Sequence, residues 1–360
     1  MLKIEKRREP SQAMVYITPF IAIALTIICG FLLFAIMGKD PFRATSLIFF
    51  EPVTSLYNIS ELLVKASPLI LIALGLSMGF RAGVWNIGAE GQFTIGAVTG
   101  SAVALVFYEM EGFYILPLMC LAGILGGMLW AAIPAFLRTK FNTNEILVSL
   151  MLVYVANLLL SVLVHGPLRD PDGMNFPESR LFSDSALLPL LMEDGRAHIG
   201  FLIALVFVGL ALFIQERHML GFQIKVTGQA ARAAQYAGFS SKKMVWVSFM
   251  ISGGLAGLAG TFEAAGPVGQ LVPTLPAGYG FTAIIVAFLG RLNPIGIMLG
   301  GLLIAITYIG GETAQIALTL PSATTSVFQG MLLFFLLATD ILINYRIKWF
   351  GFSKPVAKGK

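Results

Sequence analysis

The fold class follows from an apolar run near the N-terminus, AMVYITPFIAIALTIICGFLLFAIM, which extends from Ala13 to Met37. A helix needs about 20 apolar residues to cross the hydrocarbon core of a bilayer, and this run exceeds that length without a charged residue. It is also too long for the apolar core of a signal peptide, and it lacks a small-residue cleavage site. The run therefore predicts a retained membrane-spanning helix.

The composition extends this prediction to the whole chain of 360 residues. Hydrophobic residues make up 57% and charged residues 12%, against about 45–50% and about 25% in soluble proteins. The mean hydropathy is +0.84. A single soluble core could not bury so much apolar surface, so soluble enzymes, nucleic-acid binders and disordered scaffolds are excluded. We expect an all-α, polytopic membrane protein that contacts lipid and no nucleic acid.

Ten segments are long or apolar enough to be candidate spans. They are residues 14–37, 62–80, 84–107, 113–137, 146–165, 198–214, 244–265, 278–290, 294–311 and 324–344. The third is interrupted by Asn86, Glu90 and Gln92 among glycines. The eighth is too short to span alone and is expected to be tilted, broken or re-entrant.

The basic residues orient these spans. With both termini in the cytoplasm, 18 of the 24 Lys and Arg residues lie in cytoplasmic segments and 5 outside, and Lys65 lies within the second span. This distribution satisfies the positive-inside rule and requires an even number of spans. The sequence is thus interpreted as one transmembrane domain, residues 1–360, with cytoplasmic tails at 1–12 and 346–360.

Two loops are long enough to interact with other proteins. The external loop, residues 166–197, is rich in Pro, Asp and Gly, and the internal loop covers residues 215–243. The alanine-rich part of the internal loop favours a short helix, which Gly238 is placed to end. Composition alone favours a solvated connector for this internal segment.

Several kinds of site have no residues to support them. The chain contains no G-x-x-x-x-G-K-[ST] motif for ATP, no histidine or cysteine cluster for a metal and no hydrolase triad. Cys29 and Cys120 both lie in apolar runs. We therefore expect no catalytic residue, no metal and no cofactor. Glycines at four-residue spacing, such as Gly253 and Gly257, predict close helix packing.

Ionisable residues within spans are candidates for function, because burying charge in hydrocarbon is costly. Glu90 and Glu263 fit this description best. Glu90 lies in the segment Trp85-Asn-Ile-Gly-Ala-Glu-Gly-Gln92, whose polar groups suit a broken helix beside a water-filled pathway. The candidate pathway or gate residues are Trp85, Asn86, Glu90, Gln92 and Glu263. Hydrogen bonding between packed helices is the alternative explanation for all of them.

Several separated motifs resemble one transporter family. The stretch Phe80-Arg-Ala-Gly-Val-Trp-Asn-Ile-Gly-Ala-Glu-Gly-Gln-Phe-Thr-Ile-Gly96 resembles the signature of ABC-importer permeases of the branched-chain-amino-acid type, and within these the simple-sugar and nucleoside group. The stretches Asn144–Tyr154, Gly228–Gly238 and Ala283–Gly301 resemble further parts of that family, in the same order. The resemblance covers about residues 60–345, and the acidic external loop leans toward the nucleoside subgroup.

The resemblance implies a type II importer-like permease that works by alternating access. Its partners would be a cytoplasmic ABC ATPase, a second permease subunit, expected to be a different chain, and an external substrate-binding lipoprotein or periplasmic protein. The coupling helix that docks on the ATPase would include Gly228, Gln229, Arg232, Tyr236 and Gly238. The solute would be a nucleoside or a simple sugar, although a branched-chain amino acid also stays open.

Other function classes are compatible with the residues alone. The main alternative is a secondary, proton-coupled transporter that uses Glu90 or Glu263. A channel or a structural membrane scaffold is a third class. ATP-dependent uptake distinguishes an ABC permease from both of these alternatives.

Overall fold

The computed structural model describes residues 2–7, 11–321 and 323–349. These residues form two compact units: one contains residues 1–47 and 314–360, and the other contains residues 48–313. We describe each unit by itself. That the whole chain forms one transmembrane domain stays a prediction.

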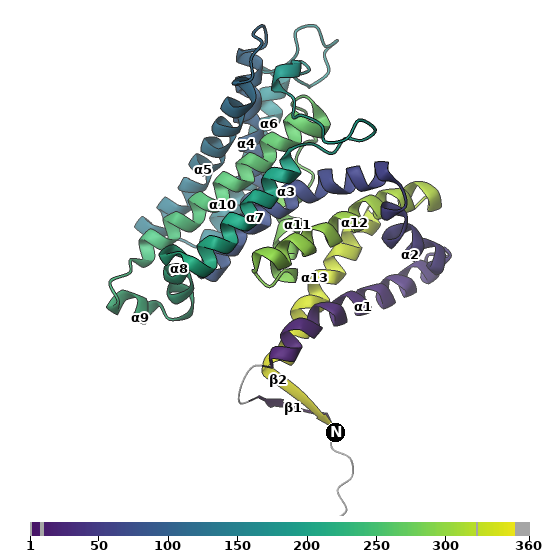
Figure 1. The fold of residues 1–360 in the computed structure, drawn as a ribbon, viewed down its shortest axis with the longest axis vertical. Coiled ribbons are helices and arrows are strands. Elements are labelled where there is room, and N and C mark those ends of the chain that lie inside the picture. Colours follow the sequence, from purple (N-terminus) through teal and green to yellow (C-terminus); the bar gives the residue numbers. More distant parts are fainter. Residues whose placement is uncertain (1, 8–10, 322, 350–360) are drawn as a thin grey trace, which may run out of the picture. The chain divides into compact units, whose positions relative to one another are not determined.

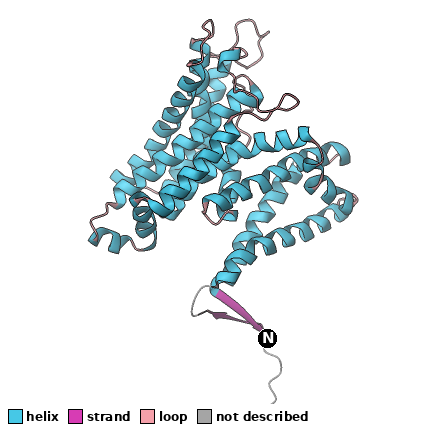
Figure 2. Ribbon diagram, in the orientation of Figure 1, coloured by secondary structure: helices cyan, strands magenta, loops and turns pink. Residues whose placement is uncertain are grey.

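The prediction of an all-α polytopic protein is confirmed (Figures 1 and 2). The helices within the described residues are α1 (Gln12–Ile36), α2 (Pro41–Phe49), α3 (Leu56–Arg81), α4 (Ala89–Val106), α5 (Ile115–Phe141), α6 (Glu145–His165), α7 (Gly200–Arg217), α8 (Met219–Gln229), α9 (Ala231–Tyr236), α10 (Ser241–Glu263), α11 (Tyr279–Leu289), α12 (Pro294–Leu318) and α13 (Ala323–Asn344). Short 3₁₀ turns cover Glu51–Val53 and Asp184–Ala186, and a π-helical turn, Ala264–Val268, follows α10.

Each of the ten predicted spans coincides with a helix, and eight of these helices among the described residues are long and apolar enough to cross a membrane. The other two are α4 and α11. As expected, α11 is too short to span alone, because it has 11 residues. The predicted start of the third span at residue 84 is wrong, since residues 84–88 form no regular helix and α4 begins at Ala89. The second span begins at Leu56 rather than 62.

Within the second unit, α10 packs against α3, α4 and α5 (Figure 1). The predicted glycine contacts are confirmed here. A Cβ added to Gly96 on α4 would lie 2.1 Å from the Cα of Gly257 on α10, and one added to Gly127 on α5 would lie 2.1 Å from the carbonyl oxygen of Gly253. Small residues thus bring three helix backbones into direct contact, as is usual where lipid provides no hydrophobic driving force.

In the first unit, α1 packs against α13. The ring of Phe34 stacks on that of Phe328 at 6.4 Å, and Gly30 leaves room for the Phe328 ring. The sequence predicts tails at residues 1–12 and 346–360 and no strand within them. In the structure, β1 (Leu2–Lys6) pairs antiparallel with β2 (Tyr345–Trp349). Both ends of the described chain therefore leave the α1–α13 pair at the same end.

The loop 166–197, which is predicted to be external, is ordered by backbone hydrogen bonds to the segment that follows α10. The amides of Phe182 and Leu188 donate to the carbonyls of Gly269 (2.8 Å) and Ala265 (2.9 Å). Beyond this loop His198 is buried, and its Nδ1 accepts the amide N–H of Gly200 at 3.2 Å. Burial lowers the pKa of His198 to about 4, so the ring is neutral near pH 7.

The loop 215–243, which is predicted to be internal, is largely helical. The expected short helix is present as α9, and Gly238 follows it with a φ of 79°. In contrast, α8 was not predicted. It is held against α3, because a Cβ on Gly228 would lie 1.9 Å from the carbonyl oxygen of Arg81.

Candidate functional site

The predicted interruption before α4 is a closed, hydrogen-bonded turn. Asn86 is 2% exposed, and its Nδ2 donates to Gln92 Oε1 (2.8 Å) and to Ser252 Oγ (2.9 Å). The Gln92 amide donates back to Asn86 Oδ1 at 3.1 Å. Gly88 makes the close approach possible, since a Cβ there would lie 2.8 Å from the Ser149 carbonyl oxygen. The side-chain amides of Asn86 and Gln92 thus form hydrogen bonds with each other, and Asn86 also bonds to Ser252 on α10 and to the backbone amide of Gly88.

Glu90, on the first turn of α4, supports the short helix α11. One carboxylate oxygen accepts the amide N–H of Gly278 at 2.7 Å and the other accepts that of Gly280 at 2.5 Å. The first N–H groups of any helix lack partners within the helix, and a carboxylate also interacts favourably with the positive end of the helix dipole. A Cβ on Gly280 would lie 2.2 Å from the backbone nitrogen of Glu90, so glycine is required for this approach.

Glu263, the last residue of α10, contacts the residue between those two glycines. Tyr279 is fully buried, and its hydroxyl donates to Glu263 Oε1 at 3.1 Å. Lys65 on α3 donates to the same hydroxyl at 2.7 Å, and its Nζ lies 5.4 Å from the centre of the Tyr279 ring. Glu90 and Glu263, both predicted from the sequence, thus converge on the start of α11.

Further polar residues continue from this cluster. We call the whole set the polar stripe; it consists of Tyr57, Glu61 and Lys65 on α3, Glu263 on α10, Tyr279 and Thr282 on α11, and Tyr308 and Glu312 on α12. Thr282 Oγ1 lies 3.1 Å from the Tyr308 hydroxyl. At the loop end, Arg196 makes a two-pronged ion pair with Glu61, with Nε 2.7 Å from Oε1, and this hydrogen bond raises the pKa of Arg196.

Sequence reasoning missed most of this stripe. Lys65 was noted within a span without a role, and Tyr279, Tyr308 and Glu312 were not selected. The signal that could have found them is the four-residue spacing of Tyr57, Glu61 and Lys65, which places all three on one helix face over about 12 Å.

Trp85 lies apart from the stripe. It is 41% exposed, and its ring is 5.0 Å from Phe80 and 5.9 Å from Phe288. Its amide donates to Glu145, which pairs with Arg138 at 2.5 Å. The five predicted pathway residues therefore fall into separate places: two carboxylates at α11, the amides of Asn86 and Gln92 on either side of the start of α4, and one exposed indole.

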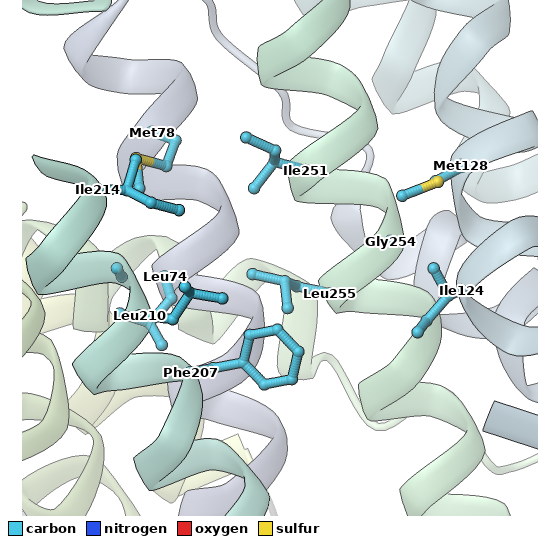
Figure 3. Close-up of a pocket in the computed structure, with 11 residues that line it drawn as sticks. Leu74, Met78, Ile124, Met128, Phe207, Leu210, Ile214, Ile251, Gly254 and Leu255 are labelled. Carbon is cyan, nitrogen blue, oxygen red and sulfur yellow. The ribbon is translucent and has the colours of Figure 1, made fainter. Parts of the chain in front are cut away.

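A cavity of about 210 Å³ lies between α3, α5, α7 and α10, and it has an apolar lining (Figure 3). In Figure 3, Phe207 and Leu210 from α7 face Ile251 and Leu255 on α10 across the opening. The cavity offers almost no hydrogen-bonding group to a polar solute. The polar stripe is therefore the stronger candidate for contact with one.

The second candidate site is the surface of α9. Arg232, Gln235 and Tyr236 line a shallow hollow there, and Tyr236 is 94% exposed. Gln229 ends α8 just before this helix. Of the predicted coupling residues, Arg232 and Tyr236 lie on α9, Gly228 and Gln229 end α8, and Gly238 follows α9. The helix α8 packs against α3. Within the described residues no group of three or more His, Cys, Asp or Glu side chains could hold a metal ion.

Comparison with known proteins identifies the family. Residues 58–337 match the family described as "Branched-chain amino acid transport system / permease component". The glucose ABC transporter permease protein TsgB13 of Haloferax volcanii is 36% identical over 96% of this chain and 93% of its own length. Two guanosine ABC transporter permease proteins of Bacillus subtilis also match: NupP is 29% identical (89% of this chain, 92% of its own), and NupQ is 31% identical (65% and 75%).

These names describe membrane transport components rather than enzymes. The family match covers more than half of the chain, and the TsgB13 match covers nearly all of it. The many long apolar helices agree with a multi-pass membrane protein. The chain therefore belongs to this family of ABC transporter permeases.

Proposed function

We propose that this permease moves a nucleoside or a simple sugar inward across the cytoplasmic membrane, driven by ATP. The observation that carries the proposal is the near full-length similarity to permeases named for glucose and guanosine. Both solutes are rich in hydroxyl groups and carry no net charge. The polar stripe is compatible with such solutes, because its hydroxyl groups can donate and accept hydrogen bonds, Lys65 can donate them and Glu263 can accept them.

The ATPase would dock on the α8–α9 segment, and α9 is the proposed coupling helix. The residues proposed to contact the ATPase or to position this segment are Gly228, Gln229, Arg232, Tyr236 and Gly238. Two features support this role: α9 presents exposed side chains, and α8 is held tightly against the end of α3. Movement of α9 would therefore be transmitted to a membrane helix, as alternating access requires.

A second, different permease would complete the pathway, and an external binding lipoprotein or periplasmic protein would deliver the solute. The heterodimer is supported by the two similar guanosine permeases named in one bacterium. Within the membrane, Trp85, Asn86, Glu90, Gln92 and Glu263 keep their proposed place along or beside the pathway. The contacts favour a supporting role for Asn86, Glu90 and Gln92, whose polar groups bond to protein.

Both termini are proposed to be cytoplasmic. The pairing of β1 with β2 supports a common side for the two tails. The excess of 18 basic residues over 5 supports the cytoplasm as that side.

The test is uptake by the complete transporter in proteoliposomes. This chain is co-expressed with its partner ATPase, second permease and binding protein. Uptake of labelled guanosine, glucose and leucine is then measured with and without ATP on the side of the membrane that carries the ATPase. We expect ATP-dependent uptake of guanosine or glucose. Uptake of leucine alone would contradict the solute class. Uptake driven by a proton gradient without ATP would contradict the mechanism in favour of the proton-coupled carrier, which the family membership does not favour.

The coupling role has its own test. Tyr236→Asp and Arg232→Glu are expected to leave ATP hydrolysis measurable but to lower uptake per ATP by about tenfold or more, since one lost charge-assisted contact at an interface costs about 1.5–3 kcal/mol. The folded state should be unaffected, because Tyr236 is 94% exposed. Met174→Asp, at a position 90% exposed in the external loop, is the matched control. Normal uptake per ATP in both α9 variants would overturn the coupling assignment.

A further inference from the structure

A line of two hydrogen bonds joins α3, α11 and α10. Lys65 Nζ donates to the Tyr279 hydroxyl at 2.7 Å, and that hydroxyl donates to Glu263 Oε1 at 3.1 Å. A lone ammonium or carboxylate in hydrocarbon is costly, and such groups in membrane helices usually pair or face a cavity. Tyr279 therefore links two opposite charges, one on α3 and one on α10.

One side of this line opens toward more polar surface. Tyr279 itself is fully buried, but Lys65 and Tyr308 are half-buried and Glu312 is exposed. Tyr308 and Glu312 are one turn apart on α12, and Tyr308 reaches Thr282 on α11. An exposed carboxylate on a helix long enough to span the membrane needs water or protein around it. Tyr279 thus lies immediately behind a surface suited to a wet pathway.

The side chains at this surface fit a ring-shaped solute with hydroxyl groups. The rings of Tyr279 and Tyr308 are 6.0 Å apart and inclined by 44°. The half-buried Tyr308 offers a ring face to an apolar ring surface, directly beside the buried Tyr279. Lys65 supplies donors and Glu263 supplies acceptors for hydroxyl groups. A few well-placed polar groups among aromatic rings are typical of small-molecule sites.

We propose that Tyr279 is the gate of the solute path, closed by Lys65 and Glu263. Hydroxyl groups of the solute replace the tyrosine hydroxyl on both partners, and the Tyr279 side chain then swings aside. Its backbone stays in place, because Glu90 holds the amides of Gly278 and Gly280 on either side. This inference rests on the proposed function for the chemistry of the solute, whereas the gate itself follows from the contacts.

Thiol accessibility tests the gate without measuring transport. In a background of Cys29→Ser and Cys120→Ser, Thr282→Cys reports access past Tyr279, because Thr282 is 6% exposed and lies one turn further along α11. The probe is a membrane-impermeant quaternary-ammonium methanethiosulfonate. Vesicles come from cells that make the whole transporter. We expect Tyr279→Phe, which keeps the ring, to raise the reaction rate by about tenfold, because it removes a hydrogen bond to each of two charged groups. Glu263→Gln should act in the same direction.

Two controls make the result specific. Ser101→Ala removes another fully buried hydroxyl and should leave the rate unchanged. Leu158→Cys, at a position 68% exposed on α6, should not react if it faces lipid. In the Tyr279→Phe variant, where the gate is already open, glucose or guanosine should slow the reaction at Thr282→Cys by occupying the path. Equal rates with Tyr279→Phe, Glu263→Gln and Ser101→Ala would overturn the gate. A gate that opens in these variants, combined with no ATP-driven uptake of either solute, would instead refute the solute class.

Discussion

Glu90 and Glu263 reach neighbouring residues of the chain, yet they contact different groups. Glu90 binds the backbone amides of Gly278 and Gly280, whereas Glu263 binds the side chain of Tyr279. A side chain can rotate while its backbone stays fixed, so the two carboxylates have separable effects. Removal of Glu90 should weaken the fold, and removal of Glu263 should alter access to the path.

Glu90→Leu is expected to lower the free energy of unfolding by about 3 kcal/mol or more, because two charge-assisted hydrogen bonds are worth about 1.5–3 kcal/mol each. Glu90→Gln keeps one oxygen acceptor and should lose less. Thermal unfolding in detergent measures both, and Glu109→Gln, on an exposed residue, is the control. A proton carrier would behave differently: Glu90→Gln would then abolish transport at unchanged stability.

His198 predicts a pH dependence of stability. The buried ring has a pKa of about 4, below the value of about 6.5 in an unfolded chain. Because the unfolded chain binds the proton more tightly, stability is full above about pH 6.5 and falls toward pH 4, by up to about 3 kcal/mol. His198→Gln should flatten this part of the unfolding profile, and His165→Gln, at an exposed position, should not. An unchanged profile in His198→Gln would contradict the assignment.

At the level of elements, the long apolar helices were predictable because lipid imposes a length and a composition on each of them. Local motifs were predictable too, such as the end of α9 at Gly238. The strands β1 and β2 were not, since their partners are separated by most of the chain. The helix α8 was also missed, because its apolar residues are interrupted by Lys225 and glycines.

The candidate site shows the same division. A carboxylate in an apolar run can be found in the sequence, as Glu90 and Glu263 were. Its partner cannot, because the contact of Glu263 with Tyr279 and Lys65 depends on how α3, α10 and α11 pack. Sequence identified the residues whose burial is costly, and only the packing of the helices showed what compensates them.

Helix contact at α10 gives a matched pair of glycine predictions. Gly257→Ala should destabilise the protein by about 1–3 kcal/mol through overpacking, because its Cβ would lie 2.1 Å from the carbonyl oxygen of Gly123. Gly209→Ala on α7 meets nothing within 4 Å and should be neutral or stabilising by about 0.5–1 kcal/mol. Thermal unfolding compares the two. Equal melting temperatures would show that the α10 seam tolerates side chains.

For the whole molecule, α10 relates the two long loops to the two sides of the membrane. The loop 166–197 bonds to the chain just after α10, where Leu188 donates to Ala265, and α9 lies just before α10 begins at Ser241. A helix of 23 residues is about 35 Å long, which exceeds the hydrocarbon thickness of about 30 Å. The helix α10 is therefore long enough to separate the two loops across the membrane, as the proposed topology requires.

This arrangement predicts which side a membrane-impermeant thiol reagent reaches. In a background of Cys29→Ser and Cys120→Ser, Met174→Cys should be labelled in intact cells, because residue 174 is 90% exposed in the proposed external loop. Tyr236→Cys, at a position 94% exposed on α9, should be labelled only after the cells are opened. The two positions are matched in exposure, so a difference in labelling reports the side and not burial. Labelling of Tyr236→Cys in intact cells with protection of Met174→Cys would reverse the proposed orientation, and the excess of basic residues would then lie outside, against the positive-inside rule.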